Sequence, residues 1–220
     1  FRLYRDPIGQ LTLHYIRIVG LLKPSIFIME NVPAIMDNGL KHALIREFNR
    51  IGYKRIYFNV LRAEDYGTPS HRKRVFISNI ELKPKPLKKK LSVWDALKDL
   101  PPPGDYPPNH QPPPPLPYRK LKRVSKLKWG EALIYYEGAV RNLPNLIRLN
   151  PHETAPTVLG SSRFIHPYED RFLTVREQAR LMGFPDQFIF IGGRDEQYNL
   201  VGEAVPVPLA RSIAEYVAQV

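Results

Sequence analysis

The chain has 220 residues, of which 43% are hydrophobic, so it can bury the core of one large domain or of two small ones. Its 33 Lys and Arg against 21 Asp and Glu give a formal charge of +12, which indicates a polyanionic partner, with nucleic acid ahead of an anionic membrane surface. The absence of cysteine excludes disulfides, thiolate metal sites and a cysteine nucleophile from these residues, and no apolar stretch is long enough to span a membrane. The composition therefore predicts a soluble, intracellular protein.

The first 80 residues alternate helical and strand patterns. Two helices are expected, over residues 11–22 and 40–51, and three strands, over residues 25–29, 56–60 and 75–79. Lys23-Pro24 ends the first helix, and Gly52 is placed as the C-terminal stop of the second. The short apolar run at residues 25–29 is typical of a buried parallel strand. This part of the chain therefore predicts the α/β class and half of a doubly wound sheet.

Between about residues 81 and 118 the composition changes, because 12 of the 23 prolines fall there. Such a segment cannot form a sheet interior or a long helix. Over the overlapping range 83–128, 12 Lys and Arg stand against three Asp, so most of the excess positive charge is local. Two interpretations stay open, a solvated basic linker and a segment that binds nucleic acid.

Regular structure is expected again in the last quarter of the chain. Residues 174–177 fit a capping box, with Thr174 as N-cap and Glu177 three residues later, and they open a helix that runs to about Met182. The last helix is expected from about residue 208, with a core-facing stripe of Leu209, Ile213 and Val217.

Four segments, in this order, resemble the later blocks of the cytosine-C5 methyltransferase family: Glu30-Asn31-Val32, residues 65–76, residues 171–186 and residues 201–206. The second is similar to the family's Asp-Tyr-Gly-x-Pro-Gln-x-Arg-x-Arg block, with Ser70 in the place of Gln. The fourth is similar to the Gly-Asn-Ala-Val-Pro block, with Glu203 in the place of Asn. One such match is weak evidence, but four in order are strong. The resemblance spans nearly the whole chain and is thinnest between about residues 82 and 150.

The resemblance implies a Rossmann-like methyltransferase fold with a small, irregular domain that reads the target sequence. Residues 1–80 would form part of the catalytic domain. Residues 81–165 would form the target-recognition domain with its Pro-rich basic linker, and residues 166–220 would return to the catalytic domain as helices. By the same resemblance S-adenosylmethionine is the cofactor, and double-stranded DNA is the partner.

Two earlier blocks of the family are missing from the 220 residues. They are the Gly-rich loop that holds S-adenosylmethionine and the Pro-Cys dipeptide that supplies the nucleophile. The resemblance places Phe1 just after that cysteine. We therefore expect both blocks in a separate subunit, in a nicked piece or in an omitted segment of the same polypeptide. The 220 residues alone should not methylate DNA.

Three candidate catalytic residues follow from the resemblance. Because C5 of cytosine is a poor nucleophile, the family adds a thiolate to C6 and thereby makes C5 enamine-like. The resemblance assigns Glu30 to N3 and the exocyclic amine, Arg74 to O2, and Arg72 to a phosphate and the active-site loop. Arg72 and Arg74 lie two residues apart, so they would point to the same face of a strand. The alternatives are a surface carboxylate that caps a turn and a solvated basic strand edge.

Further candidates lie at the cofactor and at the DNA. The expected cofactor contacts are Leu11, Glu203 and Ala204, and the expected DNA contacts are Thr157, Arg163, Lys126 and Lys128. No metal site is expected. Hydrophobic core is the default interpretation of Leu11, and Thr157 is otherwise an ordinary strand threonine. Trp129, Tyr135 and Tyr136 could touch nucleic acid, although core is the commoner place for such aromatic residues.

These observations predict a DNA cytosine-C5 methyltransferase of restriction-modification type, in the cytoplasm and at the nucleoid of a prokaryote, which extrudes its target base from the duplex. A tRNA cytosine-C5 methyltransferase is the alternative among enzymes. A non-catalytic DNA-binding or regulatory subunit, in which Glu30 and Arg74 would be relics, is the alternative outside them. A generic basic α/β binding module would require four accidental matches.

Overall fold

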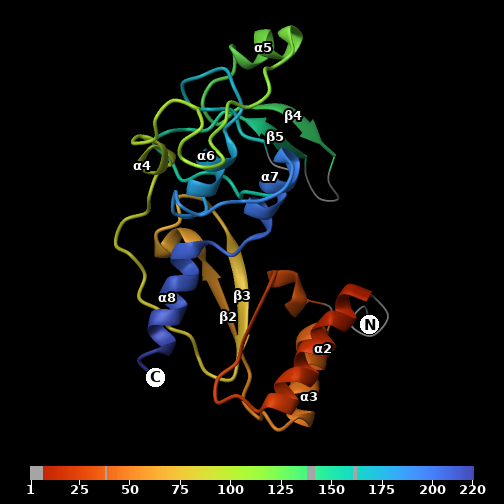
Figure 1. Ribbon diagram of the computed structural model, residues 1–220. Coiled ribbons are helices and arrows are strands. Elements are labelled where there is room, and N and C mark those ends of the chain that lie inside the picture. The colour runs from red at the N-terminus through yellow and green to blue at the C-terminus, as the bar shows by residue number, and fades with distance from the viewer. Residues whose placement is uncertain (1–6, 38, 138–141, 161–162) are drawn as a thin grey trace. The chain divides into compact units, whose positions relative to one another are not determined.

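The computed structural model describes residues 7–37, 39–137, 142–160 and 163–220 (Figure 1). The described residues fall into two compact units. The sheet unit takes in those of the ranges 1–62, 73–84 and 213–220, and the loop-rich unit takes in those of 63–72 and 85–212. The division into 1–80, 81–165 and 166–220 stays a prediction.

The sheet unit is built on three strands in the order β1-β3-β2, namely β1 (Ile28–Asn31), β3 (Lys73–Ser78) and β2 (Tyr57–Arg62). Both outer strands pair antiparallel with β3. The expectation of a parallel strand at residues 25–29 is therefore wrong, because β1 begins at Ile28 and its ladder is antiparallel. A run of apolar residues signals burial but not the direction of the neighbouring strand, and Glu30 within β1 is only half-buried.

One face of this sheet packs against the helices of the same unit, α2 (Pro7–Leu22) and α3 (Leu40–Arg50), and against the 3-10 turn η1 (Pro33–Met36). The sheet contributes the buried side chains of Met29, Val75 and Ile77 to this core, and Phe58 of β2 packs against it partly buried. Phe27, just before β1, stacks on Phe48 of α3 with ring centroids 4.7 Å apart. The core thus fixes one face of the sheet and leaves Glu30 to the other, since side chains alternate along a strand.

The ends of both helices agree with their sequence signals. Helix α2 begins four residues before the expected Leu11 and ends at Leu22, where Lys23 takes a φ of 50°. Helix α3 ends at Arg50, and Gly52 takes a φ of 101°, a left-handed conformation that suits glycine. The predicted stops are therefore confirmed.

The loop-rich unit contains short elements: η2 (Ala63–Tyr66), α4 (Val93–Leu97), α5 (Tyr118–Val124), β4 (Ala132–Tyr136), β5 (Leu143–Ile147), α6 (Val175–Arg180) and α7 (Arg194–Glu203). Strands β4 and β5 form an antiparallel pair. Helix α8 (Val207–Val217) starts in this unit, and Leu209 and Ile213 of its expected stripe are buried while Val217 is half-buried. None of the described helices is long and apolar enough to cross a membrane.

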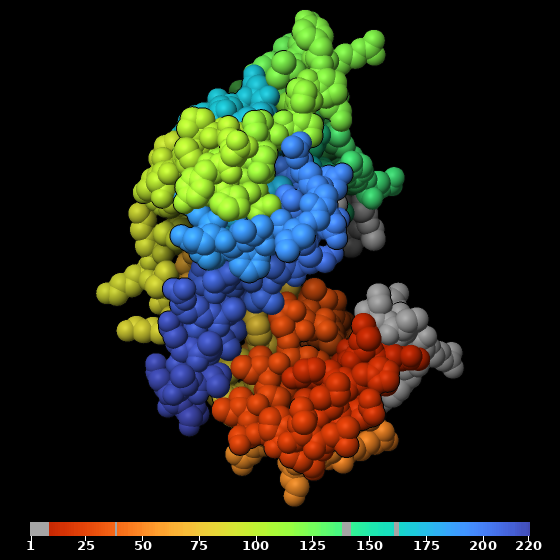
Figure 2. Space-filling view, in the orientation of Figure 1, coloured from red at the N-terminus to blue at the C-terminus, as the bar shows by residue number. Residues whose placement is uncertain are grey.

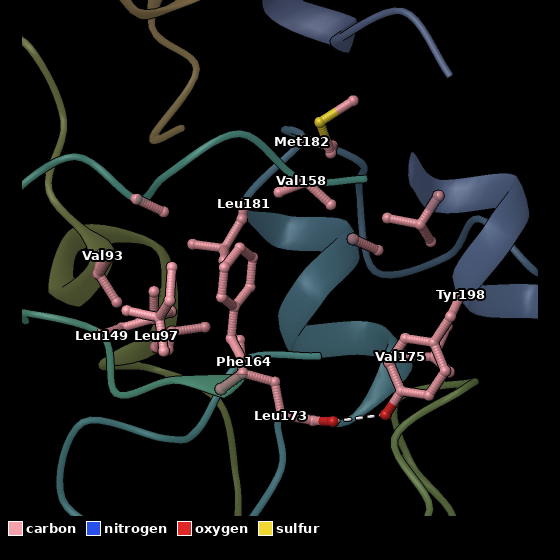
Figure 3. Close-up of a cluster of buried hydrophobic side chains, with 14 of the residues drawn as sticks. Val93, Leu97, Leu149, Val158, Phe164, Leu173, Val175, Leu181, Met182 and Tyr198 are labelled. Carbon is pink, nitrogen blue, oxygen red and sulfur yellow. Dashed lines mark hydrogen bonds between the residues drawn. The ribbon is translucent and has the colours of Figure 1, made fainter. Parts of the chain in front are cut away.

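Side chains from α4, α6, α7 and the intervening loops meet in one core (Figure 3). Its buried members include Val93, Leu97, Leu149, Val158, Phe164, Leu173, Val175, Leu181, Met182 and Tyr198. The Tyr198 hydroxyl donates to the Leu173 carbonyl at 2.5 Å. The Thr174 side chain accepts from the Glu177 N–H at 3.1 Å, and the Glu177 carboxylate accepts from the Thr174 N–H at 2.7 Å, which confirms the predicted capping box.

Part of the Pro-rich segment is built into this unit. Val93 and Leu97 of α4 are buried in the core, and His110 is fully buried. The His110 ring nitrogens lie 2.8 Å from Thr174 Oγ1 and 2.8 Å from the Pro101 carbonyl oxygen. A solvated linker has no such contacts, so that interpretation does not apply to residues 93–110.

Candidate functional site

Glu30 and Arg74 form an ion pair on one face of the sheet unit. Glu30 lies opposite Phe76 in the ladder between β1 and β3, so Arg74, two residues along β3, is its diagonal neighbour on the same face. Arg74 Nε lies 2.8 Å from Glu30 Oε1. The Arg74 side chain is 15% exposed and that of Glu30 is 33% exposed, so both remain within reach of a ligand.

The chemistry of this pair follows from its groups. The Arg74 guanidinium donates through Nη1 to the Lys73 carbonyl at 2.9 Å, which fixes its plane beside the strand. A guanidinium offers donors only, whereas a carboxyl group accepts when ionised and both donates and accepts when protonated. Together they present complementary partners to a flat heterocycle that carries a carbonyl, a ring nitrogen and an amine on one edge. The structure therefore brings two of the three expected catalytic residues together.

Arg72, the third, lies in the loop-rich unit and is 3% exposed. Its Nη1 donates to the Val158 carbonyl at 2.9 Å, and its Nη2 donates to the Glu203 carbonyl at 3.5 Å. Both acceptors are main-chain oxygens of segments far away in sequence. In this structure Arg72 thus ties together two stretches of backbone near expected functional residues, Thr157 and Glu203.

Besides the bond from Arg72 to the Val158 carbonyl, backbone hydrogen bonds to Ala155 hold the segment that contains Thr157. Residues 69–71 run alongside Ala155: the His71 N–H donates to the Ala155 carbonyl at 2.8 Å, and the Ala155 N–H donates to the Pro69 carbonyl at 3.0 Å. Thr157 follows two residues later, half-buried and outside the described strands. The alternative of an ordinary strand threonine is therefore wrong, because this backbone pairs only through the isolated bridge at Ala155.

The end of α7 lies close to the same segment. A Cβ on Gly202 would lie 2.1 Å from the Gly160 nitrogen, so only glycine fits at this position. Glu203, the last residue of α7, is exposed, and Ala204 is half-buried against the core of the unit. Arg72 and Gly202 together fix where these two expected cofactor contacts lie.

Of the expected cofactor contacts, Leu11 lies in the sheet unit, and Glu203 and Ala204 lie in the loop-rich unit. Leu11 on α2 is 65% exposed, so the default interpretation of a core residue is wrong for it. Exposed leucine can cover an apolar surface, and the carboxylate of Glu203 can accept from hydroxyl or ammonium groups. The described residues contain no cluster of His, Asp and Glu that could hold a metal ion.

The expected DNA contacts differ in their surroundings. Arg163 is engaged within the loop-rich unit, since it donates to the Gly160 carbonyl at 3.0 Å, pairs with Asp195 at 2.8 Å and lies 4.0 Å from the centroid of the Tyr198 ring. Lys126 and Lys128 are exposed in the turn after α5.

The aromatic side chains in this region are more exposed than expected. Trp129 is 45%, Tyr135 59% and Tyr136 54% exposed, so the preference for core positions is wrong for all three. Each lies on or beside the two-stranded β4–β5 sheet, which has a solvent-facing side.

A buried carboxylate beside Arg72 was not singled out from the sequence. Glu64 accepts from the Arg72 backbone N–H at 3.2 Å through Oε2, and its Oε1 lies 3.1 Å from His71 Nδ1. Its side chain is only 7% exposed. The sequence signal that could have found it is a Glu that directly precedes the Asp65-Tyr66-Gly67 block, where a short turn must be closed.

Comparisons with known proteins agree on one family. The model of the family described as C-5 cytosine-specific DNA methylase matches residues 2–219. A protein of Methanocaldococcus jannaschii that is named as a type II methyltransferase is 55% identical over 218 residues, which is 99% of this chain and 58% of that protein. A type II methyltransferase of Methanothermobacter thermautotrophicus is 35% identical over 246 residues, covering 96% of this chain and 71% of its own.

The fold has a counterpart among solved structures. A prophage-encoded protein of E. coli, described as a DNA modification methyltransferase, superposes with a TM-score of 0.76 at 24% identity, covering 97% of this chain and 75% of its own. This likeness confirms the α/β class with a Rossmann-like methyltransferase architecture. The chain spans 58% of the length of the Methanocaldococcus relative, so the remainder of that protein has no counterpart in these 220 residues.

Proposed function

Since the chain belongs to the C-5 cytosine-specific DNA methylase family, we propose that it supplies the base-activating part of a DNA cytosine-C5 methyltransferase. The observation that carries the proposal is the Glu30–Arg74 pair, a carboxyl group and a guanidinium held 2.8 Å apart on one face of a sheet. The pairing edge of cytosine carries a carbonyl O2, a ring N3 and an exocyclic amine. Arg74 can donate to O2, and a protonated Glu30 can donate to N3 while it accepts from the amine.

In the proposed reaction Glu30 is the general acid. Its proton at N3 draws electron density from the ring while a cysteine thiolate from outside the 220 residues adds to C6. Arg74 stabilises the charge that develops toward O2. C5, now enamine-like, takes the methyl group. Water, acting as a base, then removes the C5 proton, the thiolate leaves C6, and N3 returns its proton to Glu30, which gives neutral 5-methylcytosine.

S-Adenosylmethionine would supply the electrophilic methyl group. Of this chain's residues, we assign Leu11, Glu203 and Ala204 to contacts with this cofactor. In this proposal the Gly-rich loop and the nucleophile would be supplied from outside the 220 residues, by a separate subunit or by another piece of the same polypeptide.

The target base must leave the duplex to reach Glu30, because its edge is paired inside the helix. We assign the contacts that hold the flanking DNA to Thr157, at the adjacent phosphate, and to Arg163, Lys126 and Lys128. Arg72 acts in this scheme as a positioning residue for Thr157 through its bond to the Val158 carbonyl. In this proposal the enzyme acts in the prokaryotic cytoplasm, at the nucleoid, where its DNA substrate lies.

The test is Glu30→Gln in the assembled enzyme, meaning the 220 residues joined to the part that carries the Gly-rich loop and the cysteine. Transfer of labelled methyl groups to duplex DNA should fall about 100-fold or more, because a positioned general acid contributes about 10²–10⁴-fold. An enzyme indifferent to Glu30→Gln would contradict the proposal and favour a non-catalytic subunit. Methylation of tRNA but not of duplex DNA, with both offered side by side, would move the substrate to RNA.

A further inference from the structure

The loop-rich unit carries a strongly basic helix that the proposed reaction does not use. Helix α5 (Tyr118–Val124) and the turn after it contain six cations within ten residues: Arg119, Lys120, Lys122, Arg123, Lys126 and Lys128. The sequence has no Asp or Glu between Asp105 and Glu131. Within the described part of the chain, none of the six side chains forms an ion pair, so no carboxylate neutralises their charge.

The cations are ordered on the helix. Arg119, Lys122 and Arg123 follow the i, i+3, i+4 spacing, which places them on one face, and all three are exposed. Figure 2 shows the bright green segment that contains α5 as a projection with long side chains that extend into solvent. A continuous positive face, rather than scattered charge, is presented at the surface of this unit.

The opposite side of the helix is anchored. Val124 is fully buried in a small core with Leu133, Leu146 and Ile165. The Val124 carbonyl accepts from Arg148 Nη2 at 2.9 Å. Arg123 Nη2 donates to the Leu133 carbonyl at 3.2 Å and adds to this anchor. The helix is therefore held against the unit, while Arg119 and Lys122 are exposed.

This arrangement lowers the stability of the helix itself. Like charges three and four residues apart repel by a few tenths of a kcal/mol per pair, and an isolated helix of this length is marginal. A sequence selected for stability alone would alternate the signs of charge along the face. A polyanion bound against this face would offset the repulsion between the clustered positive charges.

We propose that the Arg119–Lys122–Arg123 face of α5 binds the phosphodiester backbone of duplex DNA beside the target site. The proposal rests on the proposed function and adds to it a contact that sets affinity without reading bases. A helix of seven residues is about 10 Å long, and each strand of duplex DNA carries one phosphate per about 3.4 Å of the duplex axis, so the face can reach about two phosphates. Phosphate contacts of this kind position a protein on DNA and carry no sequence information.

The experiment measures binding of a fluorescent duplex to the 220-residue chain by anisotropy at several salt concentrations. The test variant is Arg119→Gln with Lys122→Gln, since glutamine keeps a good helix propensity. The matched control is Lys88→Gln with Lys89→Gln, which removes the same net charge from exposed lysines of the same loop-rich unit. A second variant, Arg119→Lys with Lys122→Arg, keeps both charges, and circular dichroism checks that all variants fold.

We expect the test variant to bind roughly tenfold more weakly at 0.1 M salt and to lose about 1.8 from the slope of log K against log salt, as two lost phosphate contacts require. The control variant and the charge-keeping variant should resemble the unchanged chain. Equal losses in the test and control variants would overturn the proposal, because only overall charge would then matter. The same difference on anionic vesicles or tRNA but not on duplex DNA would also overturn it.

The two experiments can distinguish a failure of the proposed function from a failure of the α5 contact. Suppose that Glu30→Gln lowers methyl transfer by about 100-fold or more, while the test and control variants bind DNA equally well. That result would contradict the α5 contact and support the proposed reaction. A chain that binds no duplex DNA at any salt concentration would overturn the α5 contact and the assignment of DNA contacts to this chain together.

Discussion

Gly202 in α7 lies so close to Gly160 that a Cβ on Gly202 would stand 2.1 Å from the Gly160 nitrogen and 2.2 Å from the Leu159 carbonyl carbon. Both obstacles are backbone atoms, which cannot move aside as the end of a flexible side chain can. The helix and the segment that follows Thr157 therefore touch main chain to main chain. Glycine at position 202 is what permits this approach.

The first prediction concerns this contact. Gly202→Ala should lower the free energy of unfolding by about 2 kcal/mol or more, since the backbone must shift to admit the methyl group. Gly193→Ala at the start of the same helix is the control, because its Cβ would meet nothing within 4 Å and should cost at most about 1 kcal/mol. Urea unfolding of both variants measures the difference, and equal effects would contradict the close approach.

The second prediction concerns Arg72. Arg72→Lys keeps the charge but cannot fork between the Val158 and Glu203 carbonyls, which lie on separate segments. The backbone beside Thr157 should loosen, so the amides of His71 and Ala155 should exchange with solvent about tenfold faster or more. Arg74→Lys serves as the control, since Arg74 makes its contacts in the sheet unit. Unchanged exchange in Arg72→Lys would show that Arg72 does not hold this segment.

The third prediction separates stability from chemistry at Glu30. Its ion pair with Arg74 is partly exposed, so solvent screens it and Glu30→Gln should change the free energy of unfolding by less than about 1 kcal/mol. The expected loss of methyl transfer in the assembled enzyme is about 100-fold or more, which corresponds to about 2.7 kcal/mol. A large loss of stability in thermal unfolding would instead mean that the pair serves the fold.

The fourth prediction is a pH dependence at Glu64. Burial raises the pKa of this carboxyl, but hydrogen bonds from its own backbone N–H, from His71 and from the Arg72 N–H outweigh that effect and bring the pKa below its ordinary 4.5. The unfolded chain therefore binds the proton more readily than the folded one, so the stability from Glu64 is present above pH 4.5 and is lost as pH falls through the lower folded value. Glu64→Gln should flatten this acid limb of the free energy of unfolding. A limb as steep as in the unchanged chain would assign it to other carboxyls.

Local signals predicted the parts of the fold that depend on local physics. The capping box at Thr174 and Glu177, the stop at Gly52 and the helices α2 and α3 all follow from backbone chemistry within a few residues. Helix α7 was not predicted, because only two of its side chains, Tyr198 and Val201, are buried, and Gly202 weakens the helical pattern near its end. The direction of β1 was predicted wrongly, since strand neighbours are decided by the rest of the chain.

The candidate site was predictable only in part for the same reason. A resemblance of short blocks identified Glu30 and Arg74, and the ladder between β1 and β3 places them as diagonal neighbours. The surroundings of Arg72 could not be predicted, because its acceptors at Val158 and Glu203 come from segments that meet only in the folded loop-rich unit. The Arg163 contacts with Asp195 and Tyr198 depend on the unpredicted α7.

The partners of Arg72 in the loop-rich unit have one more consequence. The acceptors at Val158 and Glu203 are carbonyl oxygens, which every amino acid carries, so these two bonds place no demand on which side chains stand at positions 158 and 203. The side chains at positions 158 and 203 can therefore change while the same arginine continues to hold the main chain. The surface beside Thr157 can vary in sequence without loss of the hydrogen bonds that fix its backbone.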